Sequence, residues 1–166
     1  QVIQHVSNAN LDVVQLDNAS LASVRAFVEA FKAKYDRLDV LLNNAGLMAI
    51  PRTLTEDGFE MQLGVNHLGH FALTGLLLDV ITSTPNARIH NVSSSAAFSG
   101  VINLDDLMGE RGYSRWGAYG QSKLANAAFA TELDRRLKAA GHDTIANSSH
   151  PGLVMGNLQA NSLHQS

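Results

Sequence analysis

The chain has 166 residues, of which 45% are hydrophobic and 16% charged, a composition typical of a globular domain. The net charge of −3, without a basic stripe, argues against nucleic acid as a partner. The absence of cysteine excludes disulfides and thiolate chemistry, and it suits the reducing cytoplasm. No apolar run is long enough to span a membrane and the first residues do not resemble a signal peptide, so we expect a cytoplasmic protein without a membrane span.

Strand and helix patterns alternate in the first part of the chain. Leu11–Leu16 reads as a short strand, and Ser20 can cap a helix that continues to about Tyr35 with one apolar face. Leu38–Leu42 is a short, mainly apolar strand. Such a strand is expected to be buried on both faces, as in a parallel sheet.

The middle of the chain predicts a long helix and a third strand. The helix begins at Thr55 or Asp57 and ends near Thr82. It is apolar on nearly every side, which indicates burial within the domain or against a partner. The third strand is Ala87–Val92.

The last part of the chain contains a long loop, a second long helix and a weaker strand. The loop Ala96–Tyr113 is long for a compact domain, which indicates a functional role. Ser114 can cap a helix to about Ala140, with Gly141 as its stop, and Asp143–Ser148 follows as a strand. The alternation predicts an α/β fold with a parallel sheet, in one domain that covers residues 1–166.

Polar clusters follow the predicted strands, where ligands bind in open parallel sheets. If the strands are parallel, all four clusters lie at one edge of the sheet. Together they predict a site at that edge. The clusters are Asp17–Asn18, Asn43–Gly46, Ser93–Ser95 and Ser149–Gly152.

The sequence Tyr119-Gly-Gln-Ser-Lys123 places a phenol and an ammonium four residues apart, on one face of the predicted helix. Opposite unit charges about 4 Å apart attract by about 4 kcal/mol at an effective dielectric of ~20, so the ammonium favours the phenolate. A phenol activated in this way is suited to general acid/base catalysis. The alternative is a pair of solvated side chains on a helix surface.

These motifs occur in a fixed order. Asn43-Asn44-Ala45-Gly46 follows an apolar strand, Asn66 lies in the next helix, Ser94 follows the next strand, and Tyr119 and Lys123 lie in the helix after that. From about Leu11 to Leu158 the chain therefore resembles the short-chain dehydrogenase/reductase family, in its retinol-dehydrogenase-like and protochlorophyllide-reductase-like branch. The fold implied is Rossmann-like, a doubly wound parallel sheet.

The resemblance implies a catalytic tetrad. Tyr119 would exchange a proton with the substrate oxygen, and Lys123 would activate it and bind the nicotinamide ribose. Ser94 would orient the substrate; of the serines at positions 93–95 it is the one 25 residues before the tyrosine, as in this branch. Asn66 would hold a water of the proton relay. Such a set implies hydride transfer between NADP(H), or NAD(H), and a small-molecule carbonyl or alcohol substrate.

The resemblance also implies cofactor contacts at both ends of the dinucleotide. Asp17 would meet the adenine ring, although the side chain could instead cap a turn. The segment Asn44, Ala45 and Gly46 would line the adenosine side, although Asn44 could instead join neighbouring strands. Pro151, Gly152 and Val154 would lie along the nicotinamide, with Tyr119 and Lys123 at its ribose. Gly156 stands where the family usually has a threonine, which weakens the placement of the carboxamide.

Two further features are interpreted as structural. His67 and His70 are three residues apart, but no carboxylate or third histidine completes a ligand pattern, so no metal is expected. Tyr113 has Gly117 four residues later instead of a lysine, so this tyrosine is expected to be structural.

No part of the sequence matches the Gly-rich phosphate-binding turn with which the family fold begins. We therefore interpret the chain as a piece of a longer protein that lacks the first two strands and the last strand of that fold. Leu38–Leu42 would then be an exposed sheet edge, so the piece alone is expected to be unstable, rearranged or dependent on self-association.

Two alternatives remain open from the sequence. The chain could be a non-catalytic remnant without a competent cofactor pocket. It could also be a light-dependent reductase of the protochlorophyllide kind, although that branch relies on a cysteine that this chain lacks. Members of the family often pair their two long helices, here about 57–82 and 114–140, so a homodimer is a further expectation.

Overall fold

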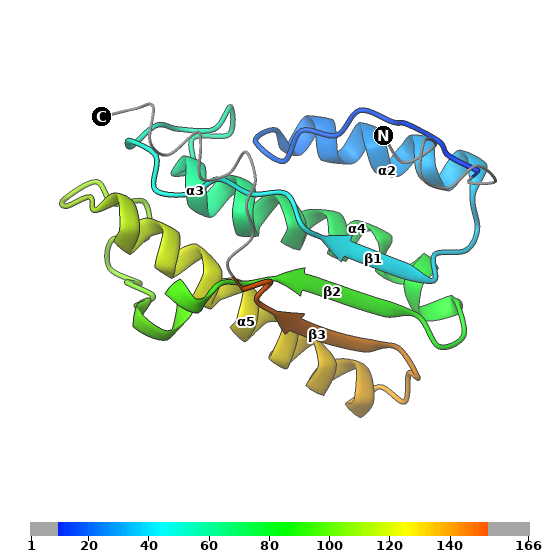
Figure 1. Ribbon diagram of the computed structural model, residues 1–166. Coiled ribbons are helices and arrows are strands. Elements are labelled where there is room, and N and C mark those ends of the chain that lie inside the picture. Colours follow the sequence, from blue (N-terminus) through cyan, green and yellow to red (C-terminus); the bar gives the residue numbers. More distant parts are fainter. Residues whose placement is uncertain (1–9, 153–166) are drawn as a thin grey trace.

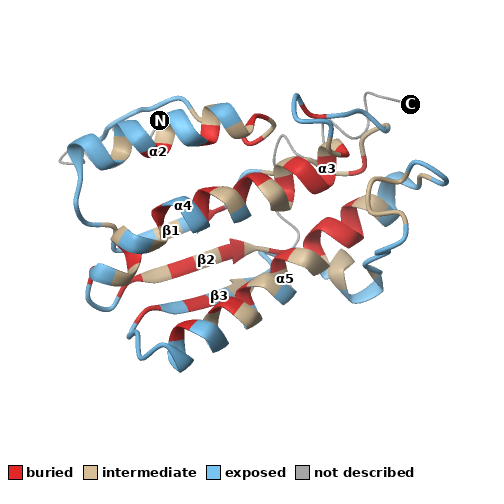
Figure 2. Cartoon of the chain, turned by 180° about the vertical axis from the view of Figure 1, so that it is seen from behind, coloured by how far each residue is buried: buried red, intermediate tan, exposed pale blue. Residues whose placement is uncertain are grey.

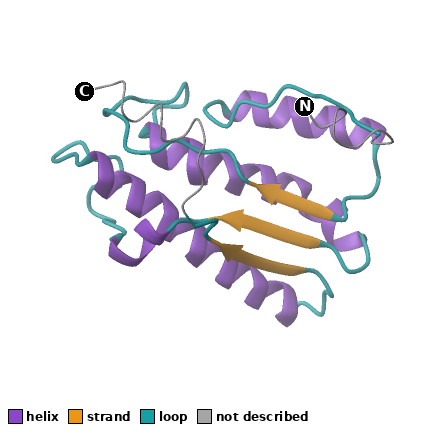
Figure 3. Ribbon diagram, in the orientation of Figure 1, coloured by secondary structure: helices purple, strands orange, loops and turns teal. Residues whose placement is uncertain are grey.

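The computed structural model describes residues 10–152 (Figure 1). Three strands alternate with helices along the chain, as Figure 3 shows. In chain order the elements are α2 (Leu21–Lys34), β1 (Val40–Asn43), α3 (Met61–Leu63), the π-helix η1 (Gly64–Leu68), α4 (Gly69–Ser83), β2 (Arg88–Val92), the 3-10 helix η2 (Ser95–Ser99), α5 (Arg115–Ala139) and β3 (Ile145–Ser149).

The three strands form one parallel sheet in the order β1-β2-β3. Asn43 of β1 aligns with Asn91 of β2, which in turn aligns with Ser148 of β3. All three strands therefore end at the same edge of the sheet, and the segments that follow them meet there. The predicted α/β class and parallel sheet are confirmed.

The core lies between the sheet and the helices that cover one of its faces, which is the near face in Figure 2. Leu77 and Ile81 of α4 pack with Ile89 of β2, and Leu133 and Leu137 of α5 close the same cluster. Contacts of α2 with α4 extend this layer beyond β1. Among the described residues the helices cover one face of the sheet only, which leaves the side chains of Val40 and Leu42 about 60% exposed on the other.

Local signals in the sequence placed the helix ends correctly. Ser20 caps α2 by accepting a hydrogen bond from the Ser23 amide, and Ser114 caps α5 in the same way through Gly117. Gly141 stops α5 with a φ of 79°, a left-handed conformation that favours glycine.

Two strand predictions were wrong in part. Leu11–Leu16 forms no strand, and Val13 is 95% exposed. A strand needs a neighbour for its backbone hydrogen bonds, and none of the described strands lies beside this segment. The Leu38–Leu42 prediction overlaps β1. This strand is not buried on both faces, but it is the exposed sheet edge expected for a chain without the first two strands of the fold.

The long middle helix begins later than predicted. Glu60 caps it, since its carboxylate accepts hydrogen bonds from the amides of Gln62 and Leu63. Asp57 instead accepts from the amide of Leu21, so it supports the start of α2. The helix then widens into the π-helical turn η1, which carries Asn66.

The outer side of α4 is apolar and partly exposed. The rings of Phe71 and Phe129 lie 5.0 Å apart, with His67 beside both, and Phe71 is 52% exposed. Burial on every side of this helix is therefore not seen, and pairing of two copies through α4 and α5 stays a prediction. No helix within residues 10–152 is both long and apolar enough to cross a bilayer.

Candidate functional site

One face of α5 carries two of the four residues predicted to be catalytic, Tyr119 and Lys123, and a further polar residue, Asn126. Tyr119, Lys123 and Asn126 follow one another at steps of four and three residues, so they share this face. All three are buried, with Tyr119 and Lys123 each 4% exposed. Within residues 10–152 the Tyr119 hydroxyl has no hydrogen-bond partner, so it can both donate to and accept from a substrate oxygen.

The Lys123 ammonium is enclosed by the ends of the first two strands. Its Nζ donates to the carbonyl oxygen of Val92 at 3.1 Å and lies 5.8 Å from the centre of the Tyr119 ring. Burial lowers the pKa of Lys123 to about 8. Among the described residues one of its three N–H donors is used, so two can bind the hydroxyls of a ligand.

Asn66 is fixed between the loop after β1 and α5. Its Oδ1 accepts from the amide of Leu47 at 2.7 Å, while its Nδ2 donates to the Leu47 carbonyl and to Ser122 Oγ. The side chain is fully buried. A β-carbon built on Gly46 would lie 3.0 Å from Asn66 Oδ1 and 3.4 Å from Lys123 Nζ, so these three residues are brought together.

The serines after β2 divide into different roles. Ser93 is buried and donates to the carbonyl of Lys123, so it ties the strand to α5. Ser94 accepts from the Ala96 amide at the start of η2 and is partly exposed. Ser95 is exposed within η2. Ser94 therefore retains a hydroxyl donor at the edge where the site lies.

A close backbone contact holds η2 against α5. A β-carbon on Gly100 would collide with the carbonyl of Gly120, and one on Gly120 would come within 3.0 Å of the Ala96 carbonyl. The two segments can approach this closely only because both positions are glycine. This approach brings the segment that follows Ser94 against the residue next to Tyr119.

The adenine side of the predicted site is joined to Asn66 by a histidine. His70 Nδ1 donates to the Asn66 backbone carbonyl at 3.0 Å, which leaves Nε2 to accept from Asn18 Nδ2 at 2.8 Å. Burial is the main reason why the pKa of His70 falls to about 4, so the ring is neutral. Asp17 accepts from the Ala19 amide and so does form the turn that was the alternative to adenine binding.

Beyond β1, Asn44 and Ala45 are exposed, and Gly46 turns toward Lys123. The role of joining strands falls to Asn43, which donates to Asn91 Oδ1 of β2 and to Thr74 of α4. Beyond β3, Pro151 and Gly152 are exposed at the same edge. Val154 and Gly156 lie outside the described residues.

The two histidines of the middle helix face different partners. His67 bonds to Asn126 through Nδ1, whereas His70 lies between Asn18 and Asn66. Within residues 10–152 no three His, Cys, Asp or Glu side chains gather around a common point.

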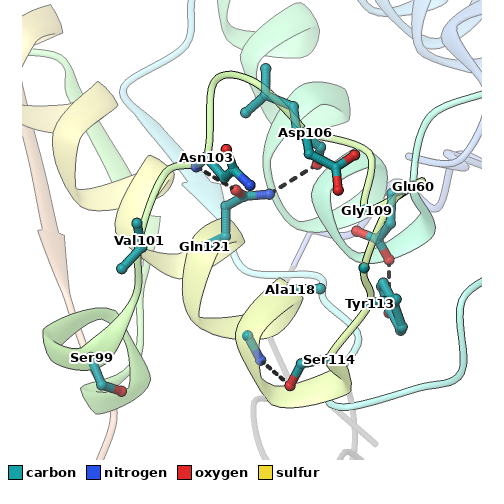
Figure 4. A pocket seen from close by; sticks show the side chains of 13 residues that line it. Glu60, Ser99, Val101, Asn103, Asp106, Gly109, Tyr113, Ser114, Ala118 and Gln121 are labelled. Atoms are coloured by element: carbon teal, nitrogen blue, oxygen red, sulfur yellow. Dashed lines mark hydrogen bonds between the residues drawn. The ribbon is translucent and has the colours of Figure 1, made fainter.

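A cavity of about 220 Å³ opens on a different face of α5 (Figure 4). It lies under the loop 101–113, and none of the four predicted catalytic residues lines it. Gln121 crosses it, accepting from the Asn103 amide and donating to the Leu107 carbonyl. The Tyr113 hydroxyl bonds with Glu60 and Gln62, and burial raises the pKa of Tyr113 to about 12. The hydrogen bonds beside this cavity therefore hold the loop 101–113 against α5. Tyr113 makes the contacts of a structural residue.

Several residues of the site were not found from the sequence. Ser122 and His70 hydrogen-bond to Asn66, and Asn126 donates to the Val92 carbonyl that also accepts from Lys123. The helical step from Tyr119 to Lys123 continues to Asn126, which was the available signal for that residue. Nothing local in the sequence indicates that His70 links Asn66 to Asn18, because Asn18 lies 52 residues away in the chain.

A parallel α/β layer with polar side chains at the carboxyl ends of its strands belongs to the class of folds that bind ligands at that edge. The short chain dehydrogenase family model matches residues 1–166, and the chain belongs to that family. It is 51% identical over 152 residues to retinol dehydrogenase 14 of Mus musculus, a match that covers 92% of this chain and 45% of the relative. The chain thus spans about half the length of the curated relatives that it matches.

Solved structures show the same fold. An uncharacterised protein from Mycobacterium paratuberculosis superposes with a TM-score of 0.80 at 48% identity, covering 95% of this chain and 56% of that one. The complex of RhlG with NADP from Pseudomonas aeruginosa superposes with a TM-score of 0.71 at 25% identity, covering 97% and 60%.

The residues present fit one end of a nicotinamide cofactor. Lys123 has N–H donors to spare, and Gly46 leaves room beside it that a β-carbon would fill. These donors suit the hydroxyls of a ribose. The pyrophosphate end has no counterpart in the described residues, because no Gly-rich turn precedes a helix there.

Proposed function

We propose that this chain carries the catalytic end of an NAD(P)-dependent oxidoreductase that interconverts a carbonyl and an alcohol. The observation that carries the proposal is the enclosed Lys123 ammonium. It lies beside the Tyr119 ring on one face of α5, and Gly46 and Asn66 lie next to it. When bound, a nicotinamide cofactor supplies or accepts the hydride. NADP is the favoured form, which the family branch and the NADP complex of RhlG support.

The chain's own residues would move and hold the proton. The Tyr119 hydroxyl donates its proton to the substrate oxygen during reduction and takes it back during oxidation. Lys123 beside the ring stabilises the phenolate that forms, and its remaining donors hold the ribose hydroxyls. Ser94 hydrogen-bonds the substrate oxygen from the other side. Asn66, fixed by Leu47, keeps the loop after β1 in register with Lys123.

Replacing Tyr119 by Phe tests this proposal. The variant is expected to lose turnover of aldehydes with NADPH while its affinity for NADPH stays within about twofold. Tyr113→Phe is the matched control, because it removes a tyrosine hydroxyl that bonds to Glu60 and Gln62 away from the site. Turnover that persists in Tyr119→Phe would refute the proposed role.

The competing hypothesis is a remnant that has kept the side chains but binds no cofactor. Titration of the 166-residue chain with NADPH and with NADH, followed by the fluorescence of the reduced nicotinamide, separates the two. Micromolar binding that weakens in Lys123→Met supports the enzyme. Absence of binding up to millimolar concentration supports the remnant.

A further inference from the structure

Trp116 extends the row of residues that carries the proposed chemistry. It lies three residues before Tyr119 and seven before Lys123, so the three side chains leave α5 on one face. Tyr119 and Lys123 are each 4% exposed, whereas Trp116 is 61% exposed. The indole thus stands at the open end of the row.

The indole ring contacts the tyrosine ring directly. Their centroids are 6.0 Å apart with an interplanar angle of 81°, an edge-to-face arrangement. The indole is therefore the exposed apolar neighbour of the ring that carries the proposed proton-donating hydroxyl.

A second exposed aromatic residue follows Ser94. Phe98 lies four residues after Ser94 in η2 and is 87% exposed. The close contact between Gly100 and Gly120 holds η2 on α5, so both aromatic residues belong to packed elements. Tyr119 and Ser94, the two residues proposed to bind the substrate oxygen, therefore each have an exposed aromatic residue three or four positions away in the chain.

We propose that Trp116 is a specificity-determining residue that contacts the hydrocarbon part of the substrate and selects long-chain over short-chain carbonyl compounds. The inference rests on the proposed function of Tyr119. Indole supplies a large, stiff apolar surface. Each added methylene of a long substrate buries more apolar area against this surface and so strengthens binding, whereas a short substrate does not reach it.

Binding can be tested without turnover, because Trp116 is the only tryptophan of the chain. Its emission is quenched by acrylamide in the presence of decan-1-ol or butan-1-ol. Decan-1-ol is expected to halve the quenching constant at a concentration at which butan-1-ol leaves it unchanged, and the protection should persist in Tyr119→Phe. Equal quenching with both alcohols would overturn the inference.

Kinetics with butanal and decanal test selectivity. Trp116→Ala is expected to lower the kcat/KM for decanal relative to butanal by at least about tenfold, mainly through KM, as for lost contacts in an apolar pocket. Trp116→Phe should recover most of that ratio. Val40→Ala is the control, since Val40 is equally exposed at 60% but lies at the opposite end of the strands.

The outcomes separate the two claims. An equal loss for both aldehydes in Trp116→Ala would assign a structural role to the indole and refute the inference. If the chain with NADPH reduces neither aldehyde, the proposed function fails, whereas the quenching experiment still decides whether Trp116 contacts a hydrocarbon chain.

Discussion

Lys123 should cost the folded chain stability at neutral pH, and Lys123→Met measures the cost. Burial lowers the pKa of Lys123 from its ordinary value of 10.5 to about 8. That difference corresponds to about 3 kcal/mol at ~1.4 kcal/mol per pH unit. Methionine keeps a stem of similar length without the charge. It loses the hydrogen bond to Val92, worth about 1 kcal/mol, but the Val92 carbonyl still accepts from Asn126.

The expected result is a variant about 2 kcal/mol more stable than the wild type at pH 7. The pKa of Lys123 is lower in the folded than in the unfolded chain, so the unfolded chain binds more protons between pH 8 and 10.5. The stability of the wild type therefore rises with pH across this window, and the advantage of Lys123→Met shrinks and disappears toward pH 10.5.

The assay is urea unfolding at pH 7 and pH 10, followed by the emission of Trp116. Comparing variants at each pH cancels the titration of all other groups. Lys138→Met is the control, because the Lys138 side chain is 66% exposed and pairs with Asp134 on the surface. Its effect should stay below about 1 kcal/mol. A destabilised Lys123→Met at pH 7, or a difference that does not change with pH, would refute the reasoning.

Three further predictions concern other parts of the fold. Because burial holds the pKa of His70 near 4, the free energy of unfolding of the wild type should fall by about 3 kcal/mol between pH 6.5 and 4. In His70→Gln the urea midpoint should depend less on pH in this range. An equal pH dependence in both proteins would contradict the prediction. Gly100→Ala should destabilise by about 2 kcal/mol because its β-carbon meets the Gly120 backbone, whereas Gly75→Ala, with open space around it, should stabilise slightly. Leu42→Lys at the exposed edge strand should reduce self-association in sedimentation without changing stability by more than about 0.5 kcal/mol.

The sequence predicted best what is decided locally. The caps at Ser20 and Ser114 and the stop at Gly141 depend on a few neighbouring residues, so the bounds of α2 and α5 agree with the prediction within one residue. The pair Tyr119 and Lys123 was accessible for the same reason, since helical spacing fixes their common face.

The sequence predicted least well what depends on distant partners. Leu11–Leu16 has the composition of a strand, but pairing decides whether a strand forms. Asp57 looked like the start of the middle helix and instead caps α2 from across the chain. Asn43 and His70 are polar residues at buried positions, and only their partners on other elements explain them.

The predicted tetrad is held together by groups that are not part of it. Asn66 is fixed through backbone atoms of Leu47, and Lys123 through the backbone carbonyl of Val92, which Asn126 also holds. These contacts are made by the chain itself, so the geometry of the site precedes ligand binding. The His70 ring bonds to the carbonyl of Asn66 and to Asn18, and Asn66 bonds to Ser122, so the turn at Asp17–Asn18 and α5 are joined in one hydrogen-bonded unit. A change at Asn18 should therefore disturb Asn66 through His70, although Asn18 lies outside the tetrad.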